Sequence, residues 1–200
     1  RRTVDALKKN HIEAFYAKTP EEAVIMFKDL VRENSVVTAG GCMTSIELGI
    51  VEILRSGVYN YIDRERPGIT PEEVQVVQRQ AFTADYFITG TNAITEKGEL
   101  FNIDGNGNRV AAISFGPKEV IVIAGSNKIV RDAEEARKRV KEISAPANAM
   151  RLDCNTPCTI DGICRNCASE KRVCCTEVLT GYQRIKNRIK VIIVDGDFGF

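Results

Sequence analysis

Residues 85–128 decide the fold and read DYFITGTNAITEKGELFNIDGNGNRVAAISFGPKEVIVIAGSNK. Two apolar runs, 86–88 and 120–123, stand near the ends of this stretch and are closed by Gly90 and Gly125. Both runs are short and rich in aromatic or β-branched residues, which is typical of strands buried on both faces. Because parallel strands are usually buried in this way, the stretch predicts a parallel sheet.

Between these two strands the sequence predicts an antiparallel insertion. Residues 99–103 and 110–113 have strand-like composition, and the Gly-Asn-Gly-Asn sequence at 105–108 separates them. A glycine-asparagine turn between two apolar runs indicates a β-hairpin. We therefore expect 99–103 and 110–113 to pair as antiparallel strands.

Outward from this stretch, helices and strands alternate. Capping residues at Thr19, Thr44, Thr70 and Asp132 predict helices over about 20–33, 44–57, 71–82 and 133–143, with Pro146 ending the last. Strands are predicted at 12–16, 35–38, 58–62, 182–185 and 189–194. This alternation indicates an α/β fold with a largely parallel sheet.

The composition excludes several classes of protein. A chain of 200 residues with 44% hydrophobic and 28% charged residues predicts an ordinary globular domain. A formal net charge of +1 gives no electrostatic footprint for nucleic acid, and no apolar run reaches the ~20 residues that span a bilayer. Because the chain opens on Arg1 and not on methionine, we expect the natural protein to carry further N-terminal residues.

A glycine-rich turn follows the strand at 35–38. Gly40, Gly41 and Cys42 precede Thr44 and Glu47, which we interpret as a capping box that opens a helix. A strand, a double glycine and a helix start together favour anion binding, because free amides point outward and a ligand can approach closely. Tight strand-to-helix turns that bind nothing use the same residues, and the turn lacks a Walker lysine.

Further polar residues gather where predicted strands end or turn. Ligands of open α/β sheets bind at the carboxyl ends of strands, although Asn, Asp and Gly also serve turn geometry alone. Together with the glycine-rich turn, these residues predict a site for a small anionic or phosphate-bearing ligand. They are Thr91, Asn92, Asp104, Asn108, Arg109, Asn127 and Lys128.

Six of the seven cysteines are crowded between Cys154 and Cys175. Clustered cysteines on a cytoplasmic α/β protein bind metal more often than they form disulfides, so we predict a cytoplasmic protein with a metal centre. Four thiolates close in sequence can hold one zinc or one iron–sulfur cluster; the alternative is a set of small buried hydrophobic residues. The predicted ligands are Cys158, Cys164, Cys167 and Cys174.

This segment also sets the domain organisation. We predict an α/β body over 1–150, a cysteine-rich metal-binding insertion over 151–177, and a C-terminal part over 178–200 whose strand returns to the body. The spacing of the cysteines matches neither the common ferredoxin run nor a standard zinc ribbon, so both kinds of centre stay open.

Several segments resemble the LUD-domain family of LutC-type lactate-utilisation proteins. They are GGCMTSIELG at 40–49, TNAITEKG at 91–98, DGNGNR at 104–109, FGPK at 115–118, GSNKIV at 125–130 and DFGF at 197–200. The resemblance covers nearly the whole chain. It implies a three-layer α/β/α fold like that of sugar-phosphate isomerases and CoA transferases, with ligands over the glycine-rich turns. Cys42 stands where the resemblance leads us to expect serine.

The resemblance also implies a function without fixing the reaction. It suggests a part in oxidising lactate or a related organic acid, and it favours a [4Fe–4S] cluster over zinc because such proteins are linked to iron–sulfur subunits. Two alternatives are a non-catalytic subunit that docks an iron–sulfur partner and an acyl-CoA or sugar-phosphate enzyme with Glu96 as nucleophile. Glu96 could equally only orient its loop, and a homo-oligomer stays open.

Overall fold

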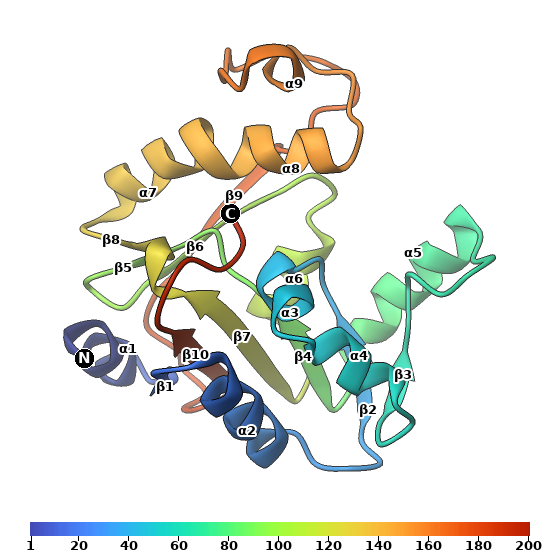
Figure 1. The fold of residues 1–200 in the computed structure, drawn as a ribbon, viewed down its shortest axis with the longest axis vertical. Helices are drawn as coiled ribbons and strands as arrows, with labels where there is room; N and C mark the ends of the chain where they lie inside the picture. Colours follow the sequence, from blue (N-terminus) through green and yellow to red (C-terminus); the bar gives the residue numbers. More distant parts are fainter.

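Six parallel strands form the central sheet of the computed structural model, which describes residues 1–200 (Figure 1). The strand order is β1-β10-β7-β4-β2-β3, and every neighbouring pair is parallel. The parallel sheet predicted from the apolar runs is therefore confirmed. The strands are β1 (Glu13–Ala17), β2 (Val36–Ala39), β3 (Asn60–Ile62), β4 (Tyr86–Thr89), β7 (Glu119–Gly125) and β10 (Ile189–Val194).

Both faces of this sheet are buried, and alternate residues of β7 belong to different cores. Val120 and Val122 pack with Leu7 of α1 (Arg2–Lys9) and Ile113 of α6 (Asn108–Ser114). Ile121 and Ile123 pack in a second core on the other face. Two helices, α2 (Pro20–Leu30) and α4 (Ile50–Arg55), supply residues to that second core, and the short helix α3 (Met43–Glu47) directly precedes α4 in the chain. The sheet is thus the middle of three layers, as expected.

A smaller four-stranded sheet lies over the α1 and α6 side, in the order β8-β5-β6-β9. Its strands are β5 (Ala93–Thr95), β6 (Leu100–Asp104), β8 (Ile129–Val130) and β9 (Thr176–Thr180). β6 runs antiparallel to β5 and β9, so the antiparallel insertion is present. Helices α7 (Ala133–Arg139) and α8 (Ala145–Arg151) cover its outer face, where Phe101 packs against Ala136 and Ala145 (Figure 1).

The predicted hairpin was wrong in its second strand, because residues 108–114 form helix α6. Gly107 takes φ +79°, and the Asp104 carboxylate accepts the backbone N–H groups of Gly107, Arg109 and Val110 at 3.3, 3.1 and 3.2 Å. These contacts satisfy free amides at a helix start. Val110 and Ile113, three residues apart, then face the core together.

Two other helix predictions need correction. The N-cap of α3 is Cys42 and not Thr44, since the Cys42 Sγ accepts the Ser45 N–H at 3.4 Å. The predicted helix over 44–57 is divided at Gly49, whose φ of +69° ends one helix and starts the next. Pro146 does not end a helix: a π-helical turn, Val140–Ser144, leads directly into α8, which holds Pro146 in its first turn.

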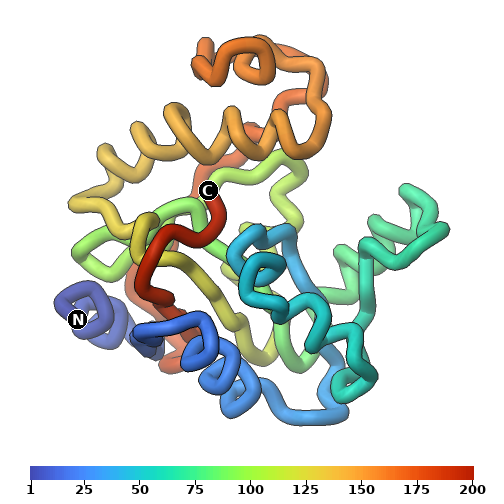
Figure 2. The backbone as a smooth tube through the Cα atoms, in the orientation of Figure 1, coloured from blue at the N-terminus to red at the C-terminus, as the bar shows by residue number.

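Three predicted helix starts are confirmed by their capping contacts. The hydroxyl of Thr19 accepts the Glu22 N–H, and Asp132 accepts the Glu135 N–H at 3.0 Å. Thr70 forms a full capping box at the start of α5 (Pro71–Gln80), a helix that projects from the body (Figure 2). The strand predicted at 182–185 is absent, and β9 lies just before it instead.

None of the helices combines the length and the apolar character that crossing a membrane requires.

Candidate functional site

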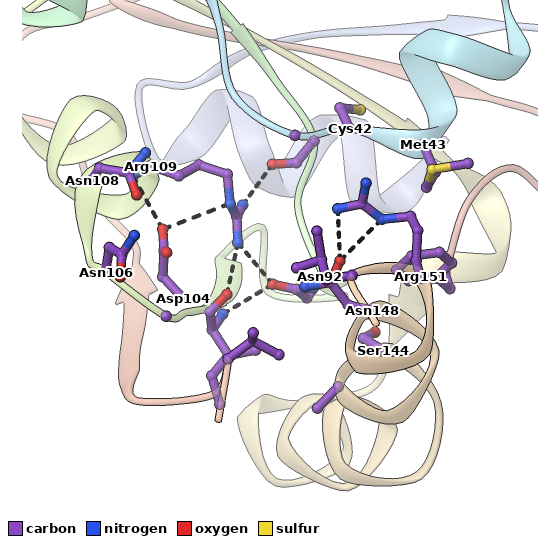
Figure 3. Close-up of a pocket in the computed structure, with 18 of the residues that line it drawn as sticks. Cys42, Met43, Asn92, Asp104, Asn106, Asn108, Arg109, Ser144, Asn148 and Arg151 are labelled. Carbon is purple, nitrogen blue, oxygen red and sulfur yellow. Dashed lines mark hydrogen bonds and ion pairs between the residues drawn. The ribbon is translucent and has the colours of Figure 1, made fainter. Parts of the chain in front are cut away.

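A cleft of about 420 Å³ opens at the carboxyl ends of β2 and β4, where these strands face α8 and the cysteine segment (Figure 3). The turn after β2 supplies Gly41 and Cys42, and the turn after β4 supplies Gly90, Thr91 and Asn92. This is the edge at which open α/β sheets bind ligands. The other lining residues include Met43, Arg64, Ile103, Asp104, Asn106, Asn108, Arg109, Lys128, Asn148, Arg151, Lys171, Arg172 and Phe200.

Most of the predicted ligand-binding residues line this cleft. They come from five separate segments of the chain, which the two sheets bring together. They are Gly41, Cys42, Thr91, Asn92, Asp104, Asn108, Arg109 and Lys128. Gly40 lies just behind them, packed so closely that an added Cβ would come within 3.0 Å of the Phe87 ring and 3.2 Å of the Arg109 side chain.

Three predicted residues, Thr44, Glu47 and Asn127, hold the segment that ends the chain. The Thr44 hydroxyl donates to the Phe198 carbonyl at 3.0 Å, and Glu47 accepts the Gly199 N–H at 2.7 Å. Asn127 donates to the Gly199 carbonyl at 3.2 Å. Their polar groups thus serve the protein itself, and Phe200 reaches the cleft wall as a result.

Glu96 lies outside the cleft. It occupies the exposed turn between β5 and β6, where its carboxylate is half exposed and 3.9 Å from the Arg2 guanidinium. A nucleophile must lie within reach of the bound substrate. The position of Glu96 therefore gives no support to a catalytic role in this cleft.

Arg109 is a structural tie and not a free anion anchor (Figure 3). Its guanidinium donates to the carbonyls of Gly90 and Ile103 at 3.1 and 2.8 Å, and to the side-chain oxygens of Asn92 and Asn102 at 3.1 and 2.6 Å. The remaining Nε lies 3.8 Å from the Asp104 carboxylate. Burial lowers the pKa of Arg109, but its donors are all directed at protein groups.

The expectation that Arg109 faces the ligand stays a prediction: the residue lines the cleft, but its N–H groups already bind protein acceptors. The guanidinium instead fixes the turn after β4 against β6, which positions the cleft wall. Asp104 is likewise committed, because its oxygens accept the first amides of α6. Asn108 remains on the wall of the cleft.

The cleft is nevertheless cationic. Lys128 is 3% exposed and has no carboxylate partner, and Arg151 donates only to the Asn148 side chain. The terminal nitrogen of Arg64 would lie 3.0 Å from a Cβ on Gly41, so it overhangs the glycine turn. Lys171 and Arg172 add charge from the cysteine segment, against the acidic residues Glu170 and Asp104.

Arg64, Arg151 and Arg172 were not predicted as cleft residues. Arg64 belongs to the loop after β3, where no helix or strand was predicted, and Arg151 ends a helix whose course the Pro146 prediction missed. Nothing in the local sequence around either arginine differs from an ordinary surface position. Only the packing of α8 across the sheet edge brings Arg151 to the cleft.

A second, small cavity of about 20 Å³ is lined by the four cysteines predicted as metal ligands, Cys158, Cys164, Cys167 and Cys174. Ala145 and Ala149 of α8 close its inner wall, whereas Cys154 and Cys175 lie outside it. The Arg172 guanidinium binds the loop together by donating to the carbonyls of Cys167 and Cys174 at 2.7 and 2.8 Å. The four cysteines thus line one cavity.

The thiols differ in their surroundings. Hydrogen bonds from Ser169 lower the pKa of Cys167, and Arg172 lowers it further. Burial raises the pKa of Cys174 despite the nearby guanidinium. In the present arrangement no group of three or more His, Cys, Asp or Glu side chains forms a coordination site for a metal ion.

The fold and the cleft define a three-layer α/β protein with a small cationic pocket at the carboxyl ends of its parallel strands. The LUD domain family model matches residues 1–194, so the chain belongs to the LUD-domain family, which is associated with lactate utilisation. The family membership suggested by the sequence segments is confirmed.

A DUF162 family protein from Deinococcus radiodurans, known from a crystal structure, has a similar fold. The TM-score is 0.54 at 16% sequence identity, over 98% of this chain and 94% of that chain. At this identity the likeness concerns the fold alone. No curated protein matches the chain.

Proposed function

We propose that the protein takes part in the oxidation of lactate or a related organic acid by binding a small carboxylate or phosphate-bearing ligand in the cleft. The observation that carries this proposal is the gathering of cations around Gly41. Arg64 and Arg151 come from separate segments, and their terminal nitrogens would lie 3.0 and 3.8 Å from a Cβ on Gly41. Arg151 has no carboxylate partner, and Lys128 adds a buried amine to the same cleft.

Electrostatics favour an anion at this place. A concave site walled by low-dielectric protein strengthens the attraction between cations and a bound anion. A volume of about 420 Å³ suits a small molecule and not a macromolecule. The turn at Gly41 supplies backbone that a ligand can approach, because only the Arg64 and Arg151 side chains lie within 4 Å of the position of a Cβ there.

Thermal unfolding in the presence of phosphate, oxalate, lactate and acyl-CoA esters tests this proposal. A ligand that binds only the folded state raises the melting temperature as its concentration rises. Arg151→Gln should weaken binding about ten-fold, because one charge-assisted hydrogen bond is worth ~1.5 kcal/mol. The matched control is Arg184→Gln, at an exposed arginine outside the cleft. Equal binding by both variants, or no stabilisation by any ligand, contradicts the proposal.

We further propose that Cys158, Cys164, Cys167 and Cys174 hold one metal centre, a [4Fe–4S] cluster in preference to zinc. The donor set supports it: four thiols line one cavity, and neither histidine nor carboxylate side chains join them. Residues 163–175 contain no helix or strand, so the sulfurs can draw together around a metal. A cluster would supply electron transfer to iron–sulfur oxidoreductase subunits, whereas zinc would supply structure only.

Metal analysis of protein purified without oxygen tests this second proposal. Iron with broad visible absorption indicates a cluster, and one zinc per colourless chain indicates a structural site. Replacing Cys164 and Cys167 together by serine should remove the metal, whereas the control Cys154→Ser, outside the cavity, should keep it. Metal-free protein that contains disulfides among the four cysteines would argue against any centre.

A second candidate function is a non-catalytic subunit that docks an iron–sulfur partner. The observation in its favour is that Ile160 and Ile163, beside the cysteine cavity, are 86% and 57% exposed. Turnover that appears only after a partner is added would favour this function, and turnover by the chain alone would exclude it. The cytoplasmic location and a homo-oligomeric state stay predictions.

A further inference from the structure

Lys128 is a buried amine that the protein leaves nearly unpartnered. Its side chain is 3% exposed, and its Nζ donates one hydrogen bond, to the Thr44 hydroxyl at 3.2 Å. An ammonium has three N–H donors, and buried lysines are almost always paired. Because Lys128 also lines the cleft, the N–H donors that have no protein acceptor are available to a molecule bound there.

The other buried cations show that this arrangement is specific to Lys128. Arg188 donates to the carbonyls of Pro117, Ile113 and Ala112, and Arg139 donates to the Asn92 carbonyl and the Ser144 hydroxyl. Both guanidinium groups therefore hold backbone segments together. Lys128 contacts a single hydroxyl, so a structural role explains little of its burial.

The surroundings of Lys128 lower its pKa, so a larger fraction of this amine is neutral than at an exposed lysine. Burial lowers the pKa of the amine most, and the nearby Arg139 and Arg109 lower it further. Cys42 and Glu47 act in the opposite direction. A neutral, buried lysine is a nucleophile towards carbonyl carbons, and neighbouring cations are one of the ways by which proteins activate it.

We infer that Lys128 captures a small carbonyl acid, such as an aldehyde acid or a 2-oxo acid, as an imine. This inference rests on the proposed anion site, because the carboxylate of the ligand would lie against Arg64 and Arg151 at the glycine turn. The amine nitrogen attacks the carbonyl carbon and a C–N bond forms. The carbonyl oxygen then leaves as water with both amine hydrogens, so the step needs no oxidant or reductant.

Reductive trapping tests the inference on the full chain. Glyoxylate, a small acid that carries an aldehyde, is added with sodium cyanoborohydride, which reduces the imine to a stable secondary amine. Peptide mapping by mass spectrometry then locates the adduct. Lys128 should be labelled several-fold faster than the exposed Lys186, because the cleft holds the acid beside the Lys128 amine and burial leaves more of that amine neutral. Oxalate, which lacks an electrophilic aldehyde, should protect Lys128 but not Lys186.

Labelling of Lys186 as fast as Lys128 would overturn the inference, as would a lack of adduct on Lys128. This comparison is made within the wild-type chain, so it does not depend on the folding of a variant; Lys128→Arg, if folded, should lose only the Lys128 adduct. Where oxalate raises the melting temperature but no adduct forms, the imine is wrong and the anion site stands. Where oxalate does not raise the melting temperature and no adduct forms on Lys128, both proposals fail.

Discussion

Replacing Arg109 by methionine should destabilise the protein by about 3–5 kcal/mol, because the change leaves buried acceptors without donors. The lost contacts are hydrogen bonds to the carbonyls of Gly90 and Ile103 and to the side chains of Asn92 and Asn102. Each bond to a charged donor contributes roughly 1.5–3 kcal/mol, so a simple sum over the four gives about 6–12 kcal/mol.

The sum is an upper bound because the acceptors differ in burial. Asn102 is completely buried, and its amide nitrogen already lacks a partner, so it cannot recover hydration. Asn92 and Ile103 line the cleft, and water entering from there can replace part of what they lose. Methionine also fills part of the space of the arginine stem, which limits the cavity cost.

Urea unfolding followed by circular dichroism measures this change, with the midpoint and slope fitted separately. Arg109→Lys should lose about half as much stability, since an ammonium keeps the charge but cannot reproduce the fork of the guanidinium. Arg184→Met, at an exposed arginine without a hydrogen-bond partner, is the control and should change stability by less than about 0.5 kcal/mol. If Arg109→Met changes stability as little as this control, the hydrogen bonds of Arg109 do not stabilise the cleft wall.

Two further measurements test other parts of the structure. Gly98→Ala should lower the free energy of unfolding by about 3 kcal/mol or more, because Gly98 has φ +79° and the new Cβ would lie 2.3 Å from the Ala6 backbone. The control is Gly68→Ala, at φ +77° in open space, which should lower it by only about 1 kcal/mol in the same thermal scan. The Asp161 carboxyl should titrate at about 2 by NMR, because Arg165 holds its pKa down from 3.8. The Arg165 contact is then present above pH 4 and lost as the pH falls through about 2, and Arg165→Gln should return the midpoint towards 3.8.

Short sequence patterns predicted most helices and strands correctly. Where a pattern suited two structures, contacts between residues distant in the sequence determined which one formed. The apolar run of β7 sufficed because both faces of that strand are buried. The Gly-Asn turn misled because the same residues suit a hairpin and a helix start. The Asp104 carboxylate, which accepts the first amides of α6, decides between the two.

The sequence predicted which turns meet at the candidate site. It did not predict which side chains there are free to contact a ligand. Strand ends placed Asn92, Asp104, Arg109 and Lys128 at one edge of the sheet, as expected. Whether a cation there is free depends on acceptors far away in sequence. Arg109 finds four of them, and Lys128 finds one hydroxyl.

The segment that ends the chain completes the surroundings of Lys128. Gly199 takes φ +62°, and a Cβ there would come within 2.8 Å of the Thr44 hydroxyl and 3.1 Å of the Lys128 Nζ. Only glycine therefore lets the segment pass so close to the amine. Glu47 and Asn127 hold it in place, and Phe200 then forms part of the cleft wall. The glycine-rich turn thus has two roles: Gly41 and Cys42 face the cleft, whereas Thr44 and Glu47 fasten the segment that encloses the amine.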